Sequence, residues 1–331
     1  MTTLGRHTRE DLKAMQALDL DDKITIARVR IQEWYEHWDG AVYVSFSGGK
    51  DSTVLSHLVR SIYPDVPAVF CDTGLEYPEV REHVFKTPNV VILRPKMDFR
   101  SVIAKYGYPV LSKEVSQRIE EARKNPKAKA SIRFLTGKNA DGSKTVYGAS
   151  DLALRVLNSD FAVSHKCCAI MKKRPFAVFE KKSGKKALNG MMAEEGRRRQ
   201  TSYVLYGCNA FDLKHPASRP LMTWTEQDVL RYIKREGLEI PSVYGEIVPV
   251  PMNGDTAGQC EMFGDGRLMT TGCERTGCMF CMFGVHLEKE PNRFQRMKIT
   301  HPAIWRYCLK PWSEGGLGMK PVLDSLGVKY E

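Results

Sequence analysis

The stretch that decides the fold is Val44-Ser-Phe-Ser-Gly-Gly-Lys-Asp-Ser-Thr53. An apolar segment at residues 41–46 runs into two glycines, and a lysine, an acid and hydroxyl residues then begin a helix. The glycines let the backbone approach a ligand closely, and the unpaired N–H groups of the first helical turn attract an anion. The spacing excludes the Walker loop GxxxxGK and the dinucleotide fingerprint GxGxxG. The stretch therefore predicts a phosphate-binding turn at residues 47–52 and disfavours a glycine turn without a ligand.

Apolar and amphipathic segments alternate along the chain after this turn. We predict further strands at residues 67–71, 89–93 and 186–190, and helices at 78–85, 171–181 and from Thr225 to Glu236. Short apolar strands that alternate with helices are typical of a parallel sheet covered on both faces. The sequence predicts an α/β fold with an open, mostly parallel, doubly wound sheet.

The 331 residues are 42% hydrophobic and 27% charged, which suits one large domain or two smaller ones. We expect a helical preface at residues 1–40, which includes an amphipathic helix from about Asp22 to Trp38. An α/β nucleotide-binding domain at 41–240 and a loop-rich region at 241–331 packed on it are expected to follow. Residues 112–160 show one lysine-rich helix and little other apolar periodicity, so we interpret them as a basic insertion.

The net charge of +11 predicts attraction to polyanions, either small nucleotides or nucleic acid. Much of this charge lies at residues 118–144 and 166–199, and a solvated basic face is the alternative interpretation. No apolar run approaches the roughly 18 to 20 residues needed to cross a bilayer. The first residues also lack the apolar centre of a signal peptide. We therefore expect a cytoplasmic protein without a membrane partner.

The chain has nine cysteines, and a reducing compartment disfavours disulfides. Five of them are grouped, which indicates a metal site: Cys167, Cys168, Cys273, Cys278 and Cys281. One CxxC supplies two thiolates, whereas a tetrahedral or cluster site needs about four ligands. Thiolate ligands suit iron-sulfur or zinc equally. Cys71, Cys208, Cys260 and Cys308 are expected to be buried or idle thiols.

Five motifs together resemble the phosphoadenosine phosphosulfate (PAPS) reductase family, within the superfamily of adenine-nucleotide α-hydrolases (PP-loop ATP pyrophosphatases). The SGGKDS turn at residues 47–52 is similar to the superfamily's pyrophosphate loop. The other four are Asp72-Thr-Gly-Leu-Glu-Tyr-Pro-Glu79, Lys166-Cys-Cys-Ala-Ile-Met-Lys-Lys-Arg-Pro175, Pro220-Leu-Met-Thr-Trp-Thr-Glu-Gln-Asp-Val229 and Thr276-Gly-Cys-Met-Phe-Cys281. They cover about residues 40–285 in the family's order. The resemblance implies that the nucleotide lies across the carboxyl ends of the parallel strands.

The resemblance also implies roles for individual residues. The phosphates would be held by Ser47, Gly48, Gly49, Lys50, Asp51 and Ser52, with Lys50 and Asp51 as catalytic residues. Asp72 and Thr73 would face the ribose or a Mg²⁺ ion, unless they form only a turn. Gly190 and Arg197 lie where the family places a glycine-arginine segment against phosphate, in a run that also contains Arg198 and Arg199.

The double-cysteine motif is similar to that of the family's iron-sulfur branch, in which the adjacent pair and the closing CxxC share one 4Fe-4S cluster. This implies Cys167, Cys168, Cys278 and Cys281 as ligands. A second set in which Cys273 replaces Cys167 is equally good, because Cys273 lies five residues before Cys278. Zinc is the alternative metal.

The resemblance implies two chemistries, cleavage of ATP and reduction of a sulfonucleotide. In a reductase, a C-terminal Glu-Cys-Gly cysteine attacks the sulfur, but the last cysteine here is Cys308 and the chain ends Leu-Gly-Val-Lys-Tyr-Glu331. The turn also retains Lys50 and Asp51, as ATP-cleaving relatives do. We favour an ATP-cleaving, pyrophosphate-releasing sulfur-transfer enzyme that uses Mg²⁺ and a sulfur donor protein, with nucleic acid as a candidate acceptor. The alternatives are an adenylylsulfate (APS) or PAPS reductase supplied by thioredoxin or a similar donor, and a zinc-braced regulator that binds nucleic acid.

Overall fold

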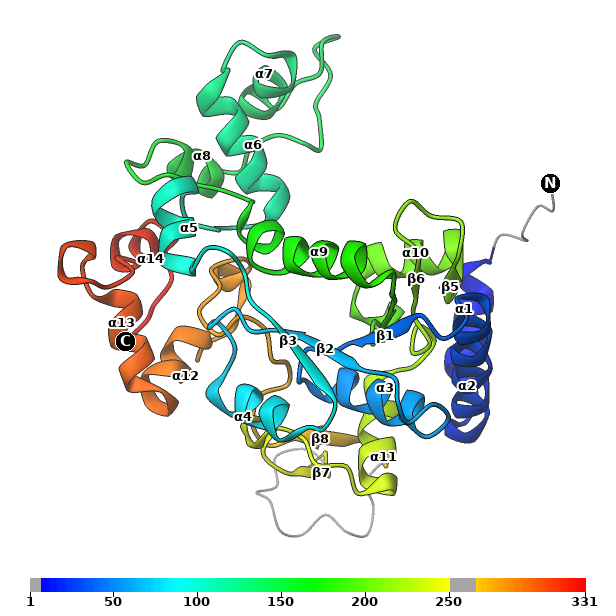
Figure 1. Cartoon of the computed structure of the whole chain (residues 1–331). Helices are drawn as coiled ribbons and strands as arrows, with labels where there is room; N and C mark the ends of the chain where they lie inside the picture. The colour runs from blue at the N-terminus through cyan, green and yellow to red at the C-terminus, as the bar shows by residue number, and fades with distance from the viewer. Residues whose placement is uncertain (1–6, 251–265) are drawn as a thin grey trace. The chain divides into compact units, whose positions relative to one another are not determined.

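The computed structural model describes residues 7–250 and 266–331, which divide into two compact units (Figure 1). In these residues the first unit comprises 7–72, 76–94, 176–250 and 266–276, and the second comprises 73–75, 95–175 and 277–331. This division differs from the three consecutive segments expected at 1–40, 41–240 and 241–331. The physical reason is the long crossover between the strands at residues 90–93 and 186–189, which are parallel members of the first unit's sheet; this crossover supplies residues 95–175 of the second unit.

The first unit is built on a six-stranded sheet with the order β3-β2-β1-β4-β6-β5. The strands are β1 Val42–Ser45, β2 Ala68–Cys71, β3 Val90–Leu93, β4 Lys186–Asn189, β5 Asn209–Ala210 and β6 Ala217–Ser218. All neighbours are parallel except β5, an antiparallel edge strand. A separate antiparallel pair consists of β7 Ile247–Pro249 and β8 Leu268–Thr270. The predicted α/β class with a mostly parallel sheet is confirmed.

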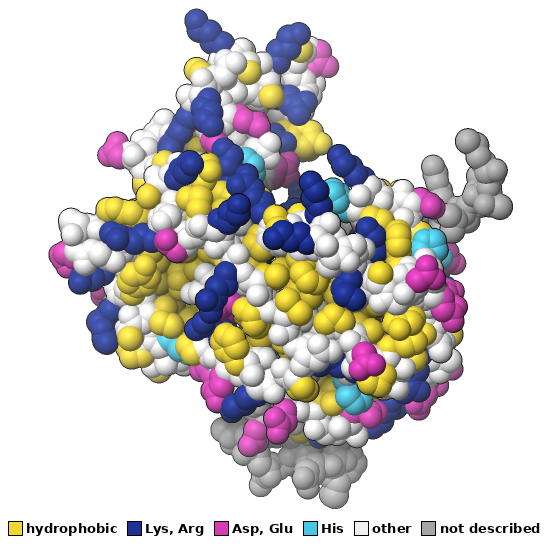
Figure 2. Space-filling model, viewed as in Figure 1, with side chains coloured by type: hydrophobic (Ala, Val, Ile, Leu, Met, Phe, Trp, Pro, Cys, Tyr) yellow, Lys and Arg dark blue, Asp and Glu magenta, His cyan; other side chains and the backbone are white. Residues whose placement is uncertain are grey.

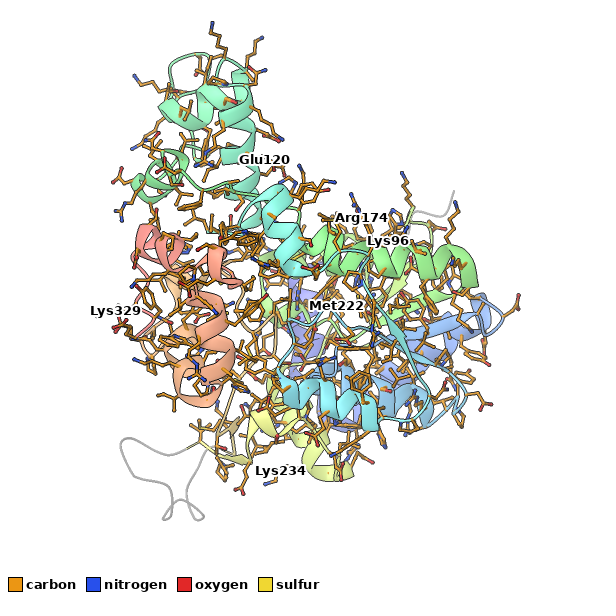
Figure 3. All side chains as sticks on the ribbon, turned by 60° about the vertical axis from the view of Figure 1, so that its left-hand side comes forward. Lys96, Glu120, Arg174, Met222, Lys234 and Lys329 are labelled. Atoms are coloured by element: carbon orange, nitrogen blue, oxygen red, sulfur yellow. The ribbon has the colours of Figure 1, made fainter. Side chains whose placement is uncertain are left out.

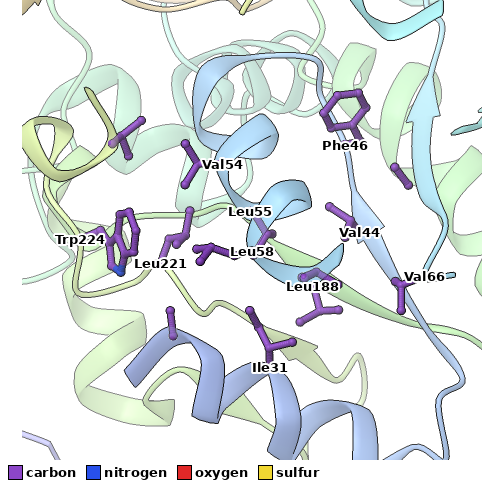
Figure 4. Packing of buried hydrophobic residues seen from close by; sticks show 14 of the residues in the cluster. Ile31, Val44, Phe46, Val54, Leu55, Leu58, Val66, Leu188, Leu221 and Trp224 are labelled. Atoms are coloured by element: carbon purple, nitrogen blue, oxygen red, sulfur yellow. The ribbon is translucent and has the colours of Figure 1, made fainter. Parts of the chain in front are cut away.

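Helices cover both faces of this sheet. They are α1 Arg9–Ala17, α2 Leu20–His37, α3 Lys50–Arg60, α4 Pro78–Lys86, α9 Arg174–Ser183, α10 Arg197–Tyr206 and α11 Glu226–Glu236, with short 3-10 turns at Ala193–Glu195 and Ser242–Tyr244. On one face, Val44 of β1 packs in a cluster with Ile31 of α2 and Leu55 of α3 (Figure 4). On the other face, Tyr43 packs against Phe176 and Phe179 of α9. Neighbouring residues of β1 thus point to opposite layers, as a doubly wound sheet requires.

Local capping signals place several helix ends. The predicted cap Thr225 begins α11, where its hydroxyl accepts the amide of Asp228 and the Asp228 carboxylate accepts the amide of Thr225. The same carboxylate accepts the ammonium of Lys23 on α2 at 2.7 Å, in a buried ion pair.

The second unit is mainly helical. Its helices are α5 Phe99–Tyr106, α6 Lys113–Lys124, α7 Lys129–Thr136, α8 Asp151–Leu157, α12 Arg293–Thr300, α13 Pro302–Leu309 and α14 Lys320–Leu326, with a π-helix at Ala169–Lys173 and 3-10 turns at Val285–Leu287 and Trp312–Glu314. Glu120 is a residue of α6 (Figure 3). None of the helices in the described residues combines the length and apolar character needed to span a membrane.

The structure adds helices to two segments for which few were expected. The basic insertion at residues 112–160, where one lysine-rich helix was expected, holds three helices, of which α6 and α8 start at serine caps, Ser112 and Ser150. The region expected to be loop-rich, 241–331, is helical over much of residues 293–326, because the Asn292 capping box and Pro302 start two successive helices. Part of the expected loop-rich segment, residues 251–265, lies outside the described residues.

Candidate functional site

The glycine turn joins β1 to α3 in a conformation that requires both glycines. Gly48 has φ 73°, and a Cβ there would lie 2.5 Å from Val84 Cγ2 and 2.8 Å from Val80 Cγ1. A Cβ on Gly49 would lie 2.9 Å from both the Thr276 Oγ1 and the Tyr244 hydroxyl. No larger residue fits without displacing α4 or the groups that contact the turn.

Serine hydroxyls brace the turn from within. The Ser47 amide donates to Ser52 Oγ at 3.2 Å, and Ser52 Oγ donates to the Gly49 carbonyl at 2.9 Å. The hydroxyls of Ser47 and Ser52 lie 3.0 Å apart. These contacts hold the chain so that α3 starts at Lys50 with Gly49 as its cap and no side-chain cap hydrogen bond, which leaves amides of the first turn for a ligand.

Lys50 is buried and engaged by a late segment of the chain. Its ammonium donates to the Glu274 carbonyl at 2.6 Å and lies 3.2 Å from Glu226 Oε1. Its amide donates to the Tyr244 hydroxyl at 3.2 Å, and that hydroxyl lies 2.8 Å from Thr276 Oγ1. Sequence analysis missed these partners, because they follow Lys50 by about 200 residues and carry no local signal of the contact.

Asp51 has a buried carboxylate oxygen, Oδ1, without a hydrogen-bond partner among the described residues. Burial raises the pKa of Asp51, and the positive charges of Lys50, Arg275 and Arg199 oppose that shift. A carboxylate oxygen in this state suits a divalent cation, because magnesium prefers oxygen ligands and carries positive charge to a desolvated anion.

Asp72 and Thr73, which follow β2, have partners within their own units. Both Asp72 carboxylate oxygens accept from the Arg81 guanidinium at 2.9 Å, and Arg94 lies 3.9 Å away. Thr73 Oγ1 accepts the Leu75 amide at 3.3 Å. Asp72 is therefore neutralised by arginine, and its role at the ribose or at Mg²⁺ stays a prediction.

Gly190 and the arginine run lie at the start of the segment after β4. A Cβ on Gly190 would lie 3.0 Å from the Asp51 carbonyl, so the close approach of β4 to α3 requires glycine here. The arginine whose charge reaches Asp51 is Arg199, which also pairs with Glu195. Among the described residues, no hydrogen bond or ion pair of the Arg197 side chain is found, and its phosphate role stays a prediction.

Four of the five grouped cysteines lie in the second unit: Cys167, Cys168, Cys278 and Cys281. Burial raises the pKa of Cys167, and the charges of the other three thiols raise it further, so these three lie within electrostatic reach of Cys167. The π-helix starts directly after Cys168, and its closing bond joins the Arg174 amide to the Ala169 carbonyl. Such π turns often occur at functional sites.

The donor chemistry of these thiols fits a metal centre, although within residues 7–250 and 266–331 no three His, Cys, Asp or Glu side chains converge closely enough to hold a single ion. The fifth cysteine, Cys273, belongs to the first unit, where its Sγ lies 3.8 Å from the Tyr77 hydroxyl. Cys71, Cys208 and Cys308 are buried as expected, and Cys260 lies outside the described residues.

Residues 41–143 and 120–283 match the family model described as phosphoadenosine phosphosulfate reductase domain. The chain belongs to this family. The matched residues include the glycine turn and the four cysteines of the second unit. The resemblance inferred from the five motifs is thereby confirmed.

Three relatives of this family member illustrate the range of its similarities. It is 25% identical to sulfate adenylyltransferase subunit 2 of Streptomyces lavendulae over 61% of the chain and 55% of that protein. It is 24% identical to adenosine 5'-phosphosulfate reductase of Staphylococcus saprophyticus over 84% of the chain and 94% of that protein. The crystal structure of PAPS reductase from Candida auris in a phosphate complex aligns with a TM-score of 0.38 at 14% identity, over 71% of this chain and 90% of that chain. The chain spans only 21% and 55% of the first curated relatives it matches.

Proposed function

We propose that this member of the PAPS reductase family is an enzyme that binds ATP at residues 47–52. An oxygen of the acceptor substrate would take the adenylyl group from ATP, pyrophosphate would leave, and sulfur would replace the activated oxygen with release of AMP. The observation that carries the proposal is the buried Asp51 oxygen at the start of α3, next to Lys50, which has no hydrogen-bond partner among the described residues. A carboxylate beside a phosphate-binding turn suits the magnesium ion that accompanies ATP. The resemblance of the turn to ATP-cleaving relatives supports the same conclusion.

The residues of the turn would have different roles in binding and catalysis. The α3 amides and the glycine backbone would bind the phosphates, and Asp51 would hold Mg²⁺. Bound there, the ion would neutralise charge that develops on the departing pyrophosphate. A phosphate oxygen would replace the Tyr244 hydroxyl at the Lys50 amide, and the Lys50 ammonium would exchange Glu226 for phosphate. Lys50 then stabilises the leaving group, so that positioning and electrostatics supply most of the catalysis.

We further propose that Cys167, Cys168, Cys278 and Cys281 hold a 4Fe-4S cluster. The electrostatic interaction of Cys167 with the other three thiols supports this set. Burial raises the pKa of Cys167 and of Cys281, so both thiols favour the protonated form in the absence of a metal. A bound metal centre would replace these protons. Zinc, which four thiolates also suit, is the alternative metal. The resemblance of the double-cysteine motif to the family's iron-sulfur branch favours the cluster. Such a cluster supplies electron transfer when bound.

Reduction of a sulfonucleotide is the second candidate, favoured by the relatives named adenosine 5'-phosphosulfate reductase. In residues 266–331 the cysteine outside the grouped set is Cys308, which is fully buried, and burial raises the pKa of its thiol. For reduction, one of the grouped cysteines would therefore be a better nucleophile than Cys308.

The test is anaerobic purification, followed by iron and sulfide analysis and two activity assays on the same protein. We expect about four irons per chain and broad absorbance near 400 nm. We also expect pyrophosphate release from ATP that is lost in Asp51→Asn and kept in Asp65→Asn, which makes the same charge change at an exposed site of the same unit. Sulfite release from adenylylsulfate with a thiol donor, without pyrophosphate release from ATP, would replace the proposal by the reductase.

The cluster ligands are tested with a matched pair of cysteine variants. Cys278→Ser should lower iron content and the stability of the second unit, because metal binding supplies folding free energy. Cys308→Ser, a change at a buried cysteine of the same unit outside the proposed ligand set, should keep its iron. Equal iron content in both variants and the parent protein would refute the ligand assignment.

A further inference from the structure

The basic insertion contains cations of two kinds, and those of the first kind are already used within the fold. The Arg123 guanidinium donates to the carbonyls of Val156, Leu157, Ser159 and Phe161, and so holds the carboxyl end of α8. Lys124, and Lys166 beyond the end of the insertion, both pair with Glu120 at 2.7 Å. These three side chains have partners within the fold and are less available to a ligand than cations without such partners.

The second kind has no hydrogen-bonding or ion-pairing partner in the part of the chain that the structure describes. Five cations in residues 127–144 form no side-chain hydrogen bond or ion pair with any residue that the structure describes: Lys127, Lys129, Arg133, Lys138 and Lys144. The four lysines are exposed, and the acid within this segment, Asp141, is used to cap a turn through Ser143. We call these five residues the lysine surface. Figure 2 shows Lys and Arg side chains gathered over α6 and α7.

The backbone that carries the lysine surface is ordered by hydrogen bonds. Lys138 and Lys144 are bridged antiparallel partners, the Thr145 amide donates to the Gly137 carbonyl at 2.9 Å, and the Ala149 amide donates to Phe134 at 2.8 Å. Like charges on directly opposed residues of such a bridge destabilise it. A turn that keeps two lysines in this position gains stability when an anion binds to both.

An exposed tyrosine orients arginines at the edge of this surface. The guanidinium carbons of Arg118 and Arg133 lie 4.8 Å and 4.7 Å from the centre of the Tyr147 ring. Arg118 also donates to Glu114 at 2.8 Å and to the Tyr147 carbonyl at 3.3 Å, so its N–H groups are partly used. For Arg133 the cation–π contact fixes the plane of the guanidinium and leaves its N–H edge for a phosphate, whose oxygens that edge matches.

We propose that the lysine surface binds the phosphate backbone of a nucleic acid. Four exposed lysines and an oriented arginine, without acidic partners, match a repeating anion better than a single small ligand. A membrane surface fits less well, because α7 has only eight residues, two of them buried, and presents no broad apolar face for insertion. The inference goes beyond the proposed ATP chemistry, and its test depends only on residues outside the glycine turn.

The experiment compares two variants that remove four positive charges each. The test variant is Lys127→Gln, Lys129→Gln, Lys138→Gln and Lys144→Gln. The control carries the same change at four other exposed lysines without described partners, Lys181, Lys182, Lys234 and Lys289 (Lys234 is labelled on α11 in Figure 3). Binding of fluorescein-labelled single-stranded DNA and RNA is measured by anisotropy over a range of salt, and binding of a fluorescent ATP analogue is measured in the same proteins.

Each phosphate contact to a single strand contributes about 0.7 to the slope of log affinity against log salt. Loss of four contacts should lower that slope by about 3 and weaken binding at 0.1 M salt by roughly several hundred-fold. The control should keep the parent's slope, and ATP binding should be unchanged in both variants. Equal loss in both variants, or a parent protein that does not bind either strand, would overturn the proposal. Selective loss of binding to phosphatidylserine vesicles, with nucleic-acid binding intact, would assign the surface to membranes instead.

Discussion

Replacement of Asp51 by asparagine is expected to stabilise the nucleotide-free protein while it removes the proposed activity. The carboxylate is buried, one of its oxygens has no partner among the described residues, and burial raises its pKa despite the nearby Lys50, Arg275 and Arg199. A buried polar group without a partner costs about 1–3 kcal/mol, and an ionised one more. Asparagine keeps the shape and removes the charge but leaves a polar amide in the same place. Only the additional cost of the charge should therefore be recovered at neutral pH, about 1 kcal/mol. For a unit of this size that corresponds to a rise of about 2–4 °C in melting temperature.

The pH dependence of this gain follows from the direction of the pKa shift. A carboxyl whose folded pKa lies above its unfolded value favours folding when it is protonated, so the cost of its charge is full at pH values above the folded pKa. The advantage of Asp51→Asn should therefore shrink as the pH falls through the raised pKa and vanish below the ordinary value of 3.8.

The assay is thermal unfolding of the parent, Asp51→Asn and Asp65→Asn across this pH range, with and without magnesium and ATP. Asp65 is exposed, so its substitution should change stability by no more than about 0.5 kcal/mol. Magnesium with ATP should stabilise the parent and the Asp65 variant more than the Asp51 variant. A less stable Asp51→Asn at neutral pH, beside an unchanged Asp65→Asn, would mean that the fold itself satisfies the carboxylate, and the reasoning would fail.

Two further substitutions test the framework of the first unit. Lys23→Met leaves Asp228 as a buried, unpaired charge and should lower the free energy of unfolding, measured with urea, by about 3–5 kcal/mol. The double variant with Asp228→Leu should recover part of that free energy. No recovery would contradict the pairing. Gly48→Ala places an alanine in the left-handed backbone region, which costs about 1–2 kcal/mol, and its Cβ overpacks against Val80 and Val84, which costs about 1–3 kcal/mol. The substitution should also weaken ATP binding. Gly184→Ala, at φ 72° in open space, should show the strain alone, so equal losses in the two alanine variants would argue against the crowded turn.

Much of the fold was predictable because its signals are local. The apolar run before Ser47, the glycine pair and the hydroxyl residues after it place β1, the turn and α3, and Thr225 with Asp228 places the start of α11. The insertion was harder to interpret, because α7 has no side-chain cap and α8 has only seven residues, so neither shows a long apolar period.

The sequence by itself determined the α/β class, the family and the candidate phosphate turn, since each depends on residues close together in the chain. Only the tertiary structure decided that Tyr244 and Glu274 contact Lys50, that Arg81 neutralises Asp72, and that Arg123 is used inside the fold. It also decided that four cysteines from two distant segments belong to one unit. The physical reason is the distance in sequence between the interacting residues. Caps, glycine turns and apolar periods depend on neighbours within a few residues, so the sequence shows them directly. Crossovers bring together polar side chains up to about 200 residues apart, and the sequence near such a side chain does not indicate its partner.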